Sequence, residues 1–471
     1  MIFTYDKEVD PLAAFTAPPP NETPEERQIR ERKEQEAIQR SRNIEAELKA
    51  AKISMKRWKD AVKVLVLGQS MSGKSTTIKN FQITYAQKAW AEERQSWKAV
   101  ILFNLVHTVN LIVDVVQDAV DRSGRTSEHT SVDVAGRPTQ HHHKVLLRLA
   151  PLRRIEDDLK THLGAGTSEV EILSKNLESN GPSHEVELNR AIVQEFTVRS
   201  SSGWKSILAQ VRKSQSGRES QIHQALSDVV VSCKDDIRWL WNDSVTQLIL
   251  QSRSLKLDDA PGFFLNDIDR ITMHDYEPTD SDIVRARLRT TGVQEYHFTL
   301  DRANGTNLDW IMYDVAGIRT SRAAWIPYFR EITALIFMAP LSSFNERLAE
   351  DNRVNRLEDT FVLWKTICSS ELLSHVQIIL FMNKVDLLRK KLDQGIQVKK
   401  YIPEYDKGND FATVSTWFRR VFKRIFVDHR KPGSPFISHF TSVVDTQATG
   451  QTLQAVQATI LRNDIANAGL M

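Results

Sequence analysis

The residues best suited to chemistry in this chain lie between Gly68 and Ser75. Four residues separate Gly68 from Gly73, and Lys74 and Ser75 follow directly. Glycines at these positions allow a backbone that points successive N–H groups at phosphate oxygens, the lysine reaches the outer phosphates, and the serine hydroxyl is a ligand for magnesium. The spacing therefore predicts a phosphate-binding loop. We expect it to hold a nucleotide through Gly68, Gln69, Ser70, Met71, Ser72, Gly73, Lys74, Ser75 and Thr76.

Two further polar groups come directly after apolar stretches. Asp314 follows residues 310–313, which places a carboxylate where a phosphate-loop enzyme has its second contact to magnesium. Asn383, Lys384 and Asp386 follow another apolar run. The Asp386 carboxylate can accept two hydrogen bonds from the N1–H and the exocyclic amine of guanine, a pattern that adenine lacks. The sequence thus favours a guanine nucleotide as the ligand.

These groups can meet only if strands bring them to one edge of a sheet. Residues 64–67 are a short apolar run typical of a buried strand, and a helical pattern starts at Ser75. From about residue 286 strands and helices alternate, which predicts an α/β fold with a mostly parallel sheet and a ligand at its carboxyl edge. Candidate strands are 295–299, 310–313, 334–338, 377–382 and 435–441, and candidate helices are 347–368, 411–426 and 446–466.

The rest of the chain divides into three parts. Residues 1–21 contain several prolines and are expected to form a disordered leader, and 22–58 an N-terminal helix that starts with a capping box. That helix is either solvated or docked on a partner through a thin apolar stripe, and the sequence leaves both open. Residues 81–285 are expected to be mainly helical. Within them, about 120–220 is polar and rich in glycine and proline, which predicts a partly disordered insertion with one or two short helices.

Composition excludes several classes of protein. The 471 residues carry a net charge of +3, so nothing indicates nucleic acid as a partner. Two cysteines rule out a disulfide framework and suit a cytoplasmic protein. No run of 18 or more apolar residues is evident, so we expect no membrane span. His141–His143 could bind a metal, but three consecutive side chains rarely converge on one ion.

With these motifs in order, the chain resembles the α subunits of heterotrimeric G proteins. The likeness covers about 40–118 and 225–471. It is carried by 264–270, Tyr276-Glu277-Pro278-Thr279, the stretch 282–292, Trp325, 348–351, Asn355-Arg356 and the ending Gly469-Leu470-Met471. The resemblance implies a Ras-like phosphate-loop GTPase domain at 59–80 and 286–471, an inserted all-α helical domain at 81–285 and an N-terminal helix. It also implies Mg²⁺ as cofactor and GTP or GDP as bound nucleotide.

The same resemblance assigns roles to individual residues. Arg287 looks like the family's arginine finger, whose planar guanidinium suits charge that builds up on phosphate oxygens. Thr290 resembles the threonine that ligates magnesium with Ser75, with Asp314 in the second shell. Asp259 resembles a residue that reaches Lys384 across the cleft. Other expected nucleotide contacts are Leu288, Arg289, Gly317 and Val443.

Departures from the family pattern concern the switch. Ile318 stands where the family has a glutamine that orients the attacking water, so we expect hydrolysis to be impaired. Ala316 replaces a glycine, which is expected to stiffen the same segment. In the family's phosphate loop G-A-G-E-S-G-K-S, the middle glycine and the glutamate correspond to Ser70 and Met71 here. The family's arginine at Arg322 pairs with a glutamate, and we expect Arg353 at that partner position, where two arginines would repel.

Lipid anchors of the family are not expected. Ile2 stands where myristoylation requires glycine, and Ala468 replaces the cysteine that some members carry fourth from the end. Partners follow from the resemblance alone: a βγ dimer, a seven-helix receptor and an effector that the sequence does not identify. We expect a cytoplasmic protein that reaches the inner face of the plasma membrane only through partners.

Two functions remain in competition. The first is a guanine nucleotide-binding α subunit that acts as a GTP/GDP switch in G protein-coupled receptor signalling and hydrolyses GTP slowly. The alternative is a pseudo-GTPase scaffold or adaptor with constitutive or no nucleotide binding. A nucleotide or small-molecule kinase shares the phosphate loop, but it predicts neither Asn383–Asp386 nor the spacing of Arg287 and Thr290.

Overall fold

The computed structural model describes the chain in a set of ranges. These are residues 61–125, 137–162, 197–199, 227–253, 262–273, 275–291, 293–301, 307–317, 319–348 and 353–467, with single positions between and before them. The chain divides into two compact units, Met1–Ala61 and Val62–Met471. In the first unit the described positions from Pro24 to Trp58 are helical, and Arg32 pairs with Glu36 one turn further on at 3.1 Å.

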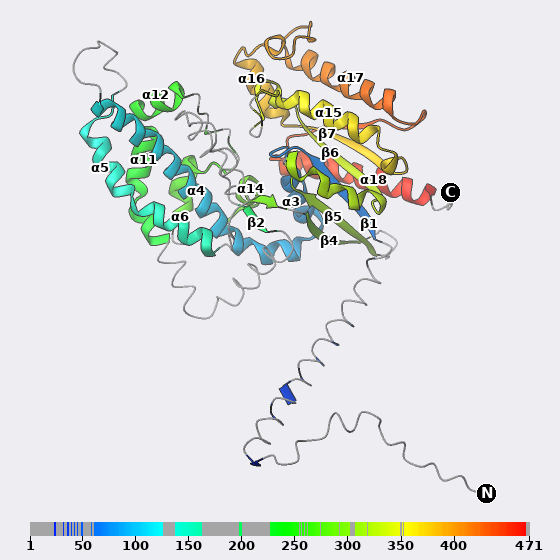
Figure 1. Cartoon of the computed structure of the whole chain (residues 1–471), viewed down its shortest axis with the longest axis horizontal. Helices are drawn as coiled ribbons and strands as arrows, with labels where there is room; N and C mark the ends of the chain where they lie inside the picture. Colours follow the sequence, from blue (N-terminus) through cyan, green and yellow to red (C-terminus); the bar gives the residue numbers. More distant parts are fainter. Residues whose placement is uncertain are drawn as a thin grey trace. The chain divides into compact units, whose positions relative to one another are not determined.

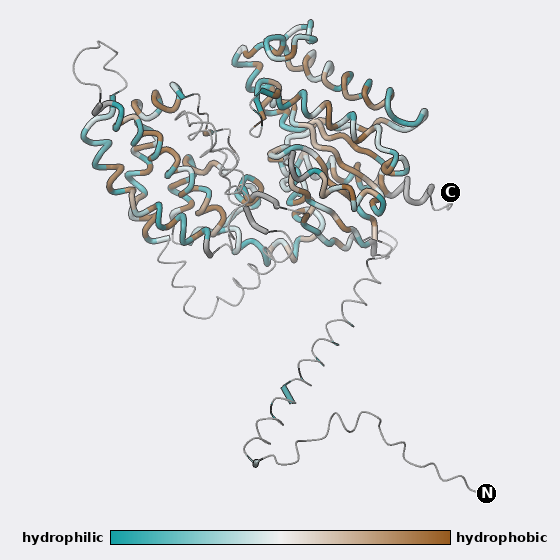
Figure 2. Tube along the Cα trace, in the orientation of Figure 1, coloured by the Kyte–Doolittle hydropathy of each residue, from teal (hydrophilic) through white to brown (hydrophobic). Residues whose placement is uncertain are grey.

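A six-stranded sheet forms the centre of the second unit. Its strand order is β4-β5-β1-β6-β7-β8, and only the β4–β5 pair is antiparallel. Every residue of β6 and β7 is buried, as expected for parallel strands covered on both faces. The strands are β1 (Val62–Gly68), β4 (Val293–Asp301), β5 (Asn307–Val315), β6 (Ala334–Pro340), β7 (Gln377–Asn383) and β8 (Ile437–Phe440). Figure 2 shows how hydrophobic residues gather along these central strands.

Helices cover both faces of this sheet (Figure 1). Ile336 and Met338 of β6 share a core with residues of α3 and α18, whereas the intervening Phe337 packs on Trp364 of α15 with ring centroids 5.0 Å apart. Successive side chains of a strand point to opposite faces, so α3 and α18 lie on one face and α15 on the other. The helices that follow the strands are α3 (Lys74–Tyr85), η3 (Arg319–Arg330), η4 (Leu341–Asn345), α15 (Arg356–Cys368), η5 (Glu371–Leu373), α16 (Val385–Asp393), η6 (Val398–Lys400), α17 (Phe411–His429) and α18 (Thr446–Asn467).

The sequence placed the start of α15 too early. A helix was expected from residue 347, but α15 begins at Arg356 and residues 341–345 form the separate turn η4. Asn355 determines this start, because its side-chain oxygen accepts the backbone N–H groups of Leu357 and Glu358.

A second set of helices shares one hydrophobic core. The long helix α4 packs against α5, α6 and α12, and α11 contacts both α5 and α12. Val145, Leu149, Leu152 and Leu159 of α5 and α6 are fully buried in this core. Residues 140–162 therefore belong to the helical layer, and the predicted disorder elsewhere in 120–220 concerns mostly residues outside the described ranges. The elements are α4 (Gln87–Arg125), α5 (Gln140–Leu149), α6 (Pro151–His162), α11 (Lys234–Asn242), α12 (Ser244–Ser252), η2 (Leu265–Asp267), α13 (Ile268–Ile271) and α14 (Asp280–Arg285).

Helix α4 is strongly apolar along much of its length. It holds an 18-residue window with a mean hydropathy of 2.0, so by length and composition it could cross a membrane. However, 83% of that window is buried inside the protein, which is the pattern of a core helix. Asn104, His107 and Asn110 interrupt the apolar residues of α4, and the burial of the helix explains why the stretch is so apolar.

A small two-stranded sheet completes the fold. In it β2 (Thr197–Arg199) pairs in parallel with β3 (Arg289–Thr291). The fold class predicted from the sequence, a mostly parallel sheet flanked by helices with an added helical layer, is confirmed.

Candidate functional site

The predicted phosphate loop connects β1 to α3 in the geometry that anion binding requires. Gly73 is the N-cap of α3 with a φ of 103°, and it provides no side-chain cap for the first N–H groups of the helix. A Cβ at Gly73 would lie 2.3 Å from Asn383 Nδ2, so only glycine fits. Met71 also has a positive φ, of 59°. The start of α3 thus presents N–H groups and the positive end of its dipole to a ligand.

Lys74 is buried beneath this loop. Its Nζ donates to the carbonyls of Gly68 at 2.9 Å and Gln69 at 2.7 Å. Burial lowers the pKa of Lys74 to about 8, although the charge of Asp314 opposes this shift. A buried cation held only by carbonyls is poorly compensated, and phosphate oxygens would restore its charged form.

Ser75 and Asp314 bring two oxygen groups together at the end of the sheet. The Ser75 hydroxyl donates to Asp314 Oδ2 at 2.5 Å, and Asp314 is fully buried in β5. Asp314 lies opposite Val66 of β1, which places it beside the strand that leads into the phosphate loop. A hydroxyl and a carboxylate next to a phosphate site are the ligand type that magnesium prefers, so these residues fit the ion.

Gly317 lies directly on the phosphate loop. Its carbonyl accepts the Ser70 N–H at 3.1 Å. A Cβ at Gly317 would be 2.4 Å from Ser70 N and 2.5 Å from Lys74 Nζ. The absence of a side chain therefore allows the segment after β5 to approach the atoms that would surround the outer phosphates.

Asn383 connects the loop to the opposite end of the site. Its Nδ2 donates to the Ser72 carbonyl at 2.7 Å, and its Oδ1 accepts from the Thr441 hydroxyl and the Val443 N–H, each at 3.2 Å. Lys384 follows with a φ of 62°, and burial, followed by the charge of Arg356, lowers its pKa to about 8. Asn383 therefore holds the ends of β7 and β8 against the phosphate loop.

These groups surround one cavity of about 400 Å³, which is within the usual range for small-molecule sites. Its polar lining includes Lys74 at one end and Lys384 with Asp386 at the other. The cavity is lined by Ser70, Met71, Gly73, Lys74, Ser75, Thr76, Lys79, Asp258, Ala260, Gly262, Phe263, Asn266, Asp267, Val284, Arg285, Ala286, Arg287, Leu288, Val315, Gly317, Asn383, Lys384, Asp386, Leu387, Ser442, Val443 and Val444.

Arg287 is held at the cavity by a residue that the sequence did not indicate. Asn104 of α4 accepts the Arg287 N–H through Oδ1 at 2.7 Å and donates to the Arg287 carbonyl through Nδ2 at 3.0 Å. Gly262, with a φ of 83°, leaves space here, since its Cβ would lie 3.1 Å from both residues. The signal available in the sequence was a polar asparagine within the apolar helical stretch 81–118.

Lys79 is a second residue that sequence reasoning missed. Its Nζ donates to the carbonyls of Ile283 at 2.9 Å and Ala286 at 2.7 Å, and lies 4.1 Å from the ring centre of Trp97. Burial lowers the pKa of Lys79 to about 7. The ammonium thus ties α3 to the segment that carries Arg287 and to α4.

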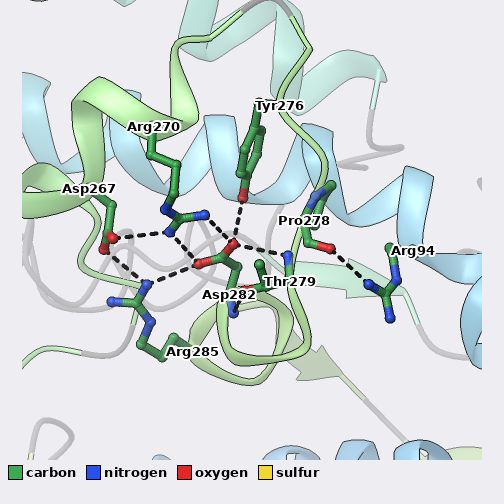
Figure 3. A network of polar contacts seen from close by, with 8 residues as sticks. All are labelled: Arg94, Asp267, Arg270, Tyr276, Pro278, Thr279, Asp282 and Arg285. Carbon is green, nitrogen blue, oxygen red and sulfur yellow. Dashed lines mark hydrogen bonds and ion pairs between the residues drawn. The ribbon is translucent and has the colours of Figure 1, made fainter.

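A polar network fixes the segment before Arg287, as Figure 3 shows. Asp282 accepts two bonds of 2.7 Å from Arg270 and one of 3.0 Å from Arg285. It also accepts the Tyr276 hydroxyl and the Thr279 N–H. Burial would raise the pKa of Asp282, but the hydrogen bonds from Arg270 and Thr279 hold it well below its usual range. The carboxylate therefore stays ionised and anchors α14.

The predicted partner of Arg322 is corrected by the structure. Arg322 donates to Asp359 Oδ2 at 2.6 Å. Arg353 pairs instead with Asp351 at 3.0 Å. Arg353 was predicted at the partner position, but the partner of Arg322 is acidic and lies one turn into α15. An ion pair therefore exists where repulsion was expected.

Some predicted site residues lie elsewhere or outside the described residues. Asp259 and Ile318 are not among the described residues, and Arg289 and Thr290 are described only as backbone of β3. The Gln69 side chain contacts α15 rather than the cavity. His142, of the three consecutive histidines, contacts Thr139 through Nδ1 and Asp243 through Nε2. In the described part of the chain, no cluster of three or more His, Cys, Asp or Glu side chains could hold a metal.

A strand, a glycine-rich loop with a buried lysine, a helix and a buried aspartate on the neighbouring strand define a phosphate-loop nucleotide-binding protein. The family model described as G-protein alpha subunit matches residues 38–460. The chain belongs to this family. Members of the family bind guanine nucleotides, are GTPases in general and act in signal transduction, typically with Mg²⁺.

The sequences of individual relatives align with nearly the whole chain. The guanine nucleotide-binding protein alpha-4 subunit of Mycosarcoma maydis is 29% identical, over 98% of this chain and 96% of the relative. A guanine nucleotide-binding protein subunit alpha of Coprinellus congregatus is 25% identical over 93% of this chain and 97% of its own. The guanine nucleotide-binding protein alpha-1 subunit of Mycosarcoma maydis is also 25% identical, over 93% of this chain and 98% of the relative.

Proposed function

We propose that this chain binds GTP and GDP with magnesium, changes conformation between the two states and hydrolyses GTP slowly. The observation that carries the proposal is that Lys74, Arg287 and Asp386 line the same cavity. Lys74 and the start of α3 supply the phosphate end. Ser75 and Thr290 would hold magnesium, which neutralises phosphate charge, and Asp314 would support it through its hydrogen bond to Ser75. Asp386 supplies the carboxylate that selects guanine.

Slow hydrolysis is proposed from the chemistry of Ile318 and Arg287. An isoleucine can neither donate nor accept a hydrogen bond, so it cannot orient the attacking water. Arg287 remains, and its backbone is held by Asn104. A residue that handles the attacking water typically contributes about 10²- to 10⁴-fold to the rate of hydrolysis. Its loss therefore slows turnover, but the rate enhancement that the Arg287 guanidinium supplies remains.

The scaffold alternative loses one of its two reasons. It rested on the missing glutamine and on repulsion at Arg322, and the Arg322–Asp359 ion pair removes the second. By family membership we further propose a βγ dimer and a seven-helix receptor as partners in G protein-coupled receptor signalling. A cytoplasmic location with recruitment to the inner face of the plasma membrane through these partners follows from the same proposal.

Equilibrium binding to the full-length protein tests the nucleotide proposal. GDP and a non-hydrolysable GTP analogue with Mg²⁺ are expected to bind by titration calorimetry, and ATP is not. Lys74→Ala should weaken binding about 10- to 100-fold, since hydrogen bonds to charged groups contribute about 1.5–3 kcal/mol. Lys423→Ala, on the exposed face of α17, is the matched control and should change nothing. Absence of guanine nucleotide binding to the natural protein would contradict the proposal and favour a scaffold.

A further inference from the structure

Gln69 belongs to the phosphate loop, yet its side chain points away from the ligand cavity. Its Nε2 donates to the Arg356 carbonyl at 2.9 Å and to Asp359 Oδ2 at 2.5 Å, and the residue is only 2% exposed. Both partners are acceptors, so the amide must present its nitrogen to them and its orientation is fixed. The side chain therefore fastens the second residue of the loop to the first turn of α15.

Asp359 is shared between this amide and η3. Its Oδ2 accepts from Gln69 and also from Arg322, the latter at 2.6 Å. Arg322 lies in η3, the segment that follows Gly317, and Asp359 is 7% exposed. One buried carboxylate thus joins the phosphate loop and η3, and hydrogen bonds to a buried charge are stronger than neutral ones.

The backbone of the same loop contacts both the buried lysine and the segment that leads into η3. The Gln69 carbonyl accepts Lys74 Nζ at 2.7 Å. The next residue, Ser70, donates its N–H to the Gly317 carbonyl at 3.1 Å. The outer phosphates of a nucleotide bound at Lys74 would therefore lie next to Gly317. Through Gly317 they can influence the position of η3.

We propose that Gln69 is a positioning residue that couples the phosphate loop to η3 through Asp359, and that this coupling favours a nucleoside triphosphate over a diphosphate. The inference rests on the proposed function. The resembled family has alanine at this position, so the amide is a feature of this chain beyond the general motif. The alanine also indicates that Gln69→Ala is compatible with the fold.

The test compares the affinities of GDP and a non-hydrolysable GTP analogue for the natural protein and for Gln69→Ala, both at full length with Mg²⁺. The ratio of triphosphate to diphosphate affinity should fall about 5- to 20-fold, within the range of typical coupling between sites, and GDP affinity should stay within about 2-fold. Trp325, whose Nε1 donates to the Ala316 carbonyl at 3.0 Å, should show a smaller fluorescence difference between the two nucleotides.

A double-mutant cycle shows whether the effect passes through Asp359. In an Asp359→Ala background, Gln69→Ala should lower the ratio no further, because the shared acceptor is already absent. Glu358→Gln, the exposed neighbour on α15, is the charge-matched control and should leave the ratio unchanged.

Each outcome has a distinct meaning. An unchanged ratio in Gln69→Ala, or an equal loss of affinity for both nucleotides, would overturn the inference and leave the proposed function intact. Additive effects of Gln69→Ala and Asp359→Ala would overturn the route through Asp359. If the natural protein binds neither nucleotide, the proposed function is wrong and the inference falls with it.

Discussion

Lys74 shows at the scale of one residue why the cavity suits an anion. The ammonium is removed from water, and this burial lowers its pKa to about 8, although it donates hydrogen bonds to the carbonyls of Gly68 and Gln69. A phosphate group placed beside it favours the charged form and raises the pKa again. Binding of a nucleotide is therefore linked to the uptake of a proton whenever the free lysine is partly neutral.

This linkage gives a pH dependence with a definite sign. At pH 8 the free Lys74 is about half protonated, so nucleotide binding should take up about half a proton, and more at pH 8.5. At pH 7 the uptake by Lys74 should be small, and affinity should fall as pH rises through 8. Calorimetry in two buffers of different ionisation enthalpy measures the uptake. Equal heats in both buffers at pH 8.5 would contradict this origin of the pH dependence.

Sequence reasoning found the residues whose chemistry is local and missed those whose partners are distant. The phosphate loop, Asp314 and Asp386 are recognised by short spacing and by the strands before them. Asn104 and Lys79 are not, because their partners lie 183 and 204 residues away and are backbone groups that carry no sequence signature. Arg322 was assigned the wrong partner for the same reason: only the fold shows which acidic residue of α15 it meets.

At the scale of elements, α4 both forms the helical core and positions Arg287. Its apolar residues Leu105, Val106 and Val109 are buried in the shared core, which fixes the helix in place. Asn104, one residue before them, is buried and makes both of its hydrogen bonds to the Arg287 backbone. A rigid helix can therefore hold an arginine on an irregular segment at a defined distance from the cavity.

Asn104→Ala should reduce hydrolysis more than nucleotide binding. Loss of both bonds lets the Arg287 backbone shift, and small misplacements of a positioned group cost up to about 10²-fold in rate, so we expect a decrease of roughly 10-fold in single-turnover hydrolysis. The matched control is Asn110→Ala, another buried asparagine of α4, which bonds Glu156 and the Leu152 carbonyl instead. If both variants lose the same activity, the effect reports general destabilisation of α4 and not the position of Arg287.

The elements themselves were largely predictable from the sequence. Apolar runs located the central strands β1, β6 and β7 because buried parallel strands need continuous hydrophobic residues. The start of α15 and the burial of α5 and α6 were not predicted. The first depends on the single cap Asn355, and the second on a short apolar pattern, Val145 to Leu159, within a polar stretch.

At the scale of the whole second unit, the cavity is lined from both the sheet and the helical layer. Lys74 and Asp386 come from the carboxyl edge of the sheet, whereas Gly262, Phe263 and Asn266 come from the end of the helical layer. Lys79 and Asn104 connect the two parts close to Arg287. This arrangement lets a nucleotide contact both parts, and the conformational switch that we propose would depend on those contacts.

Single-turnover hydrolysis of prebound GTP with Mg²⁺ is the measurement that tests the account most directly, with the natural protein compared with Ile318→Gln and Arg287→Ala. The account predicts bound GTP that is hydrolysed slowly. Ile318→Gln should raise the rate toward the roughly 10²-fold that one water-orienting residue contributes. Arg287→Ala should lower it by about 10²-fold, since one charge-stabilising group is removed. Equal rates in all three proteins, or no GTP bound to any of them, would contradict the account.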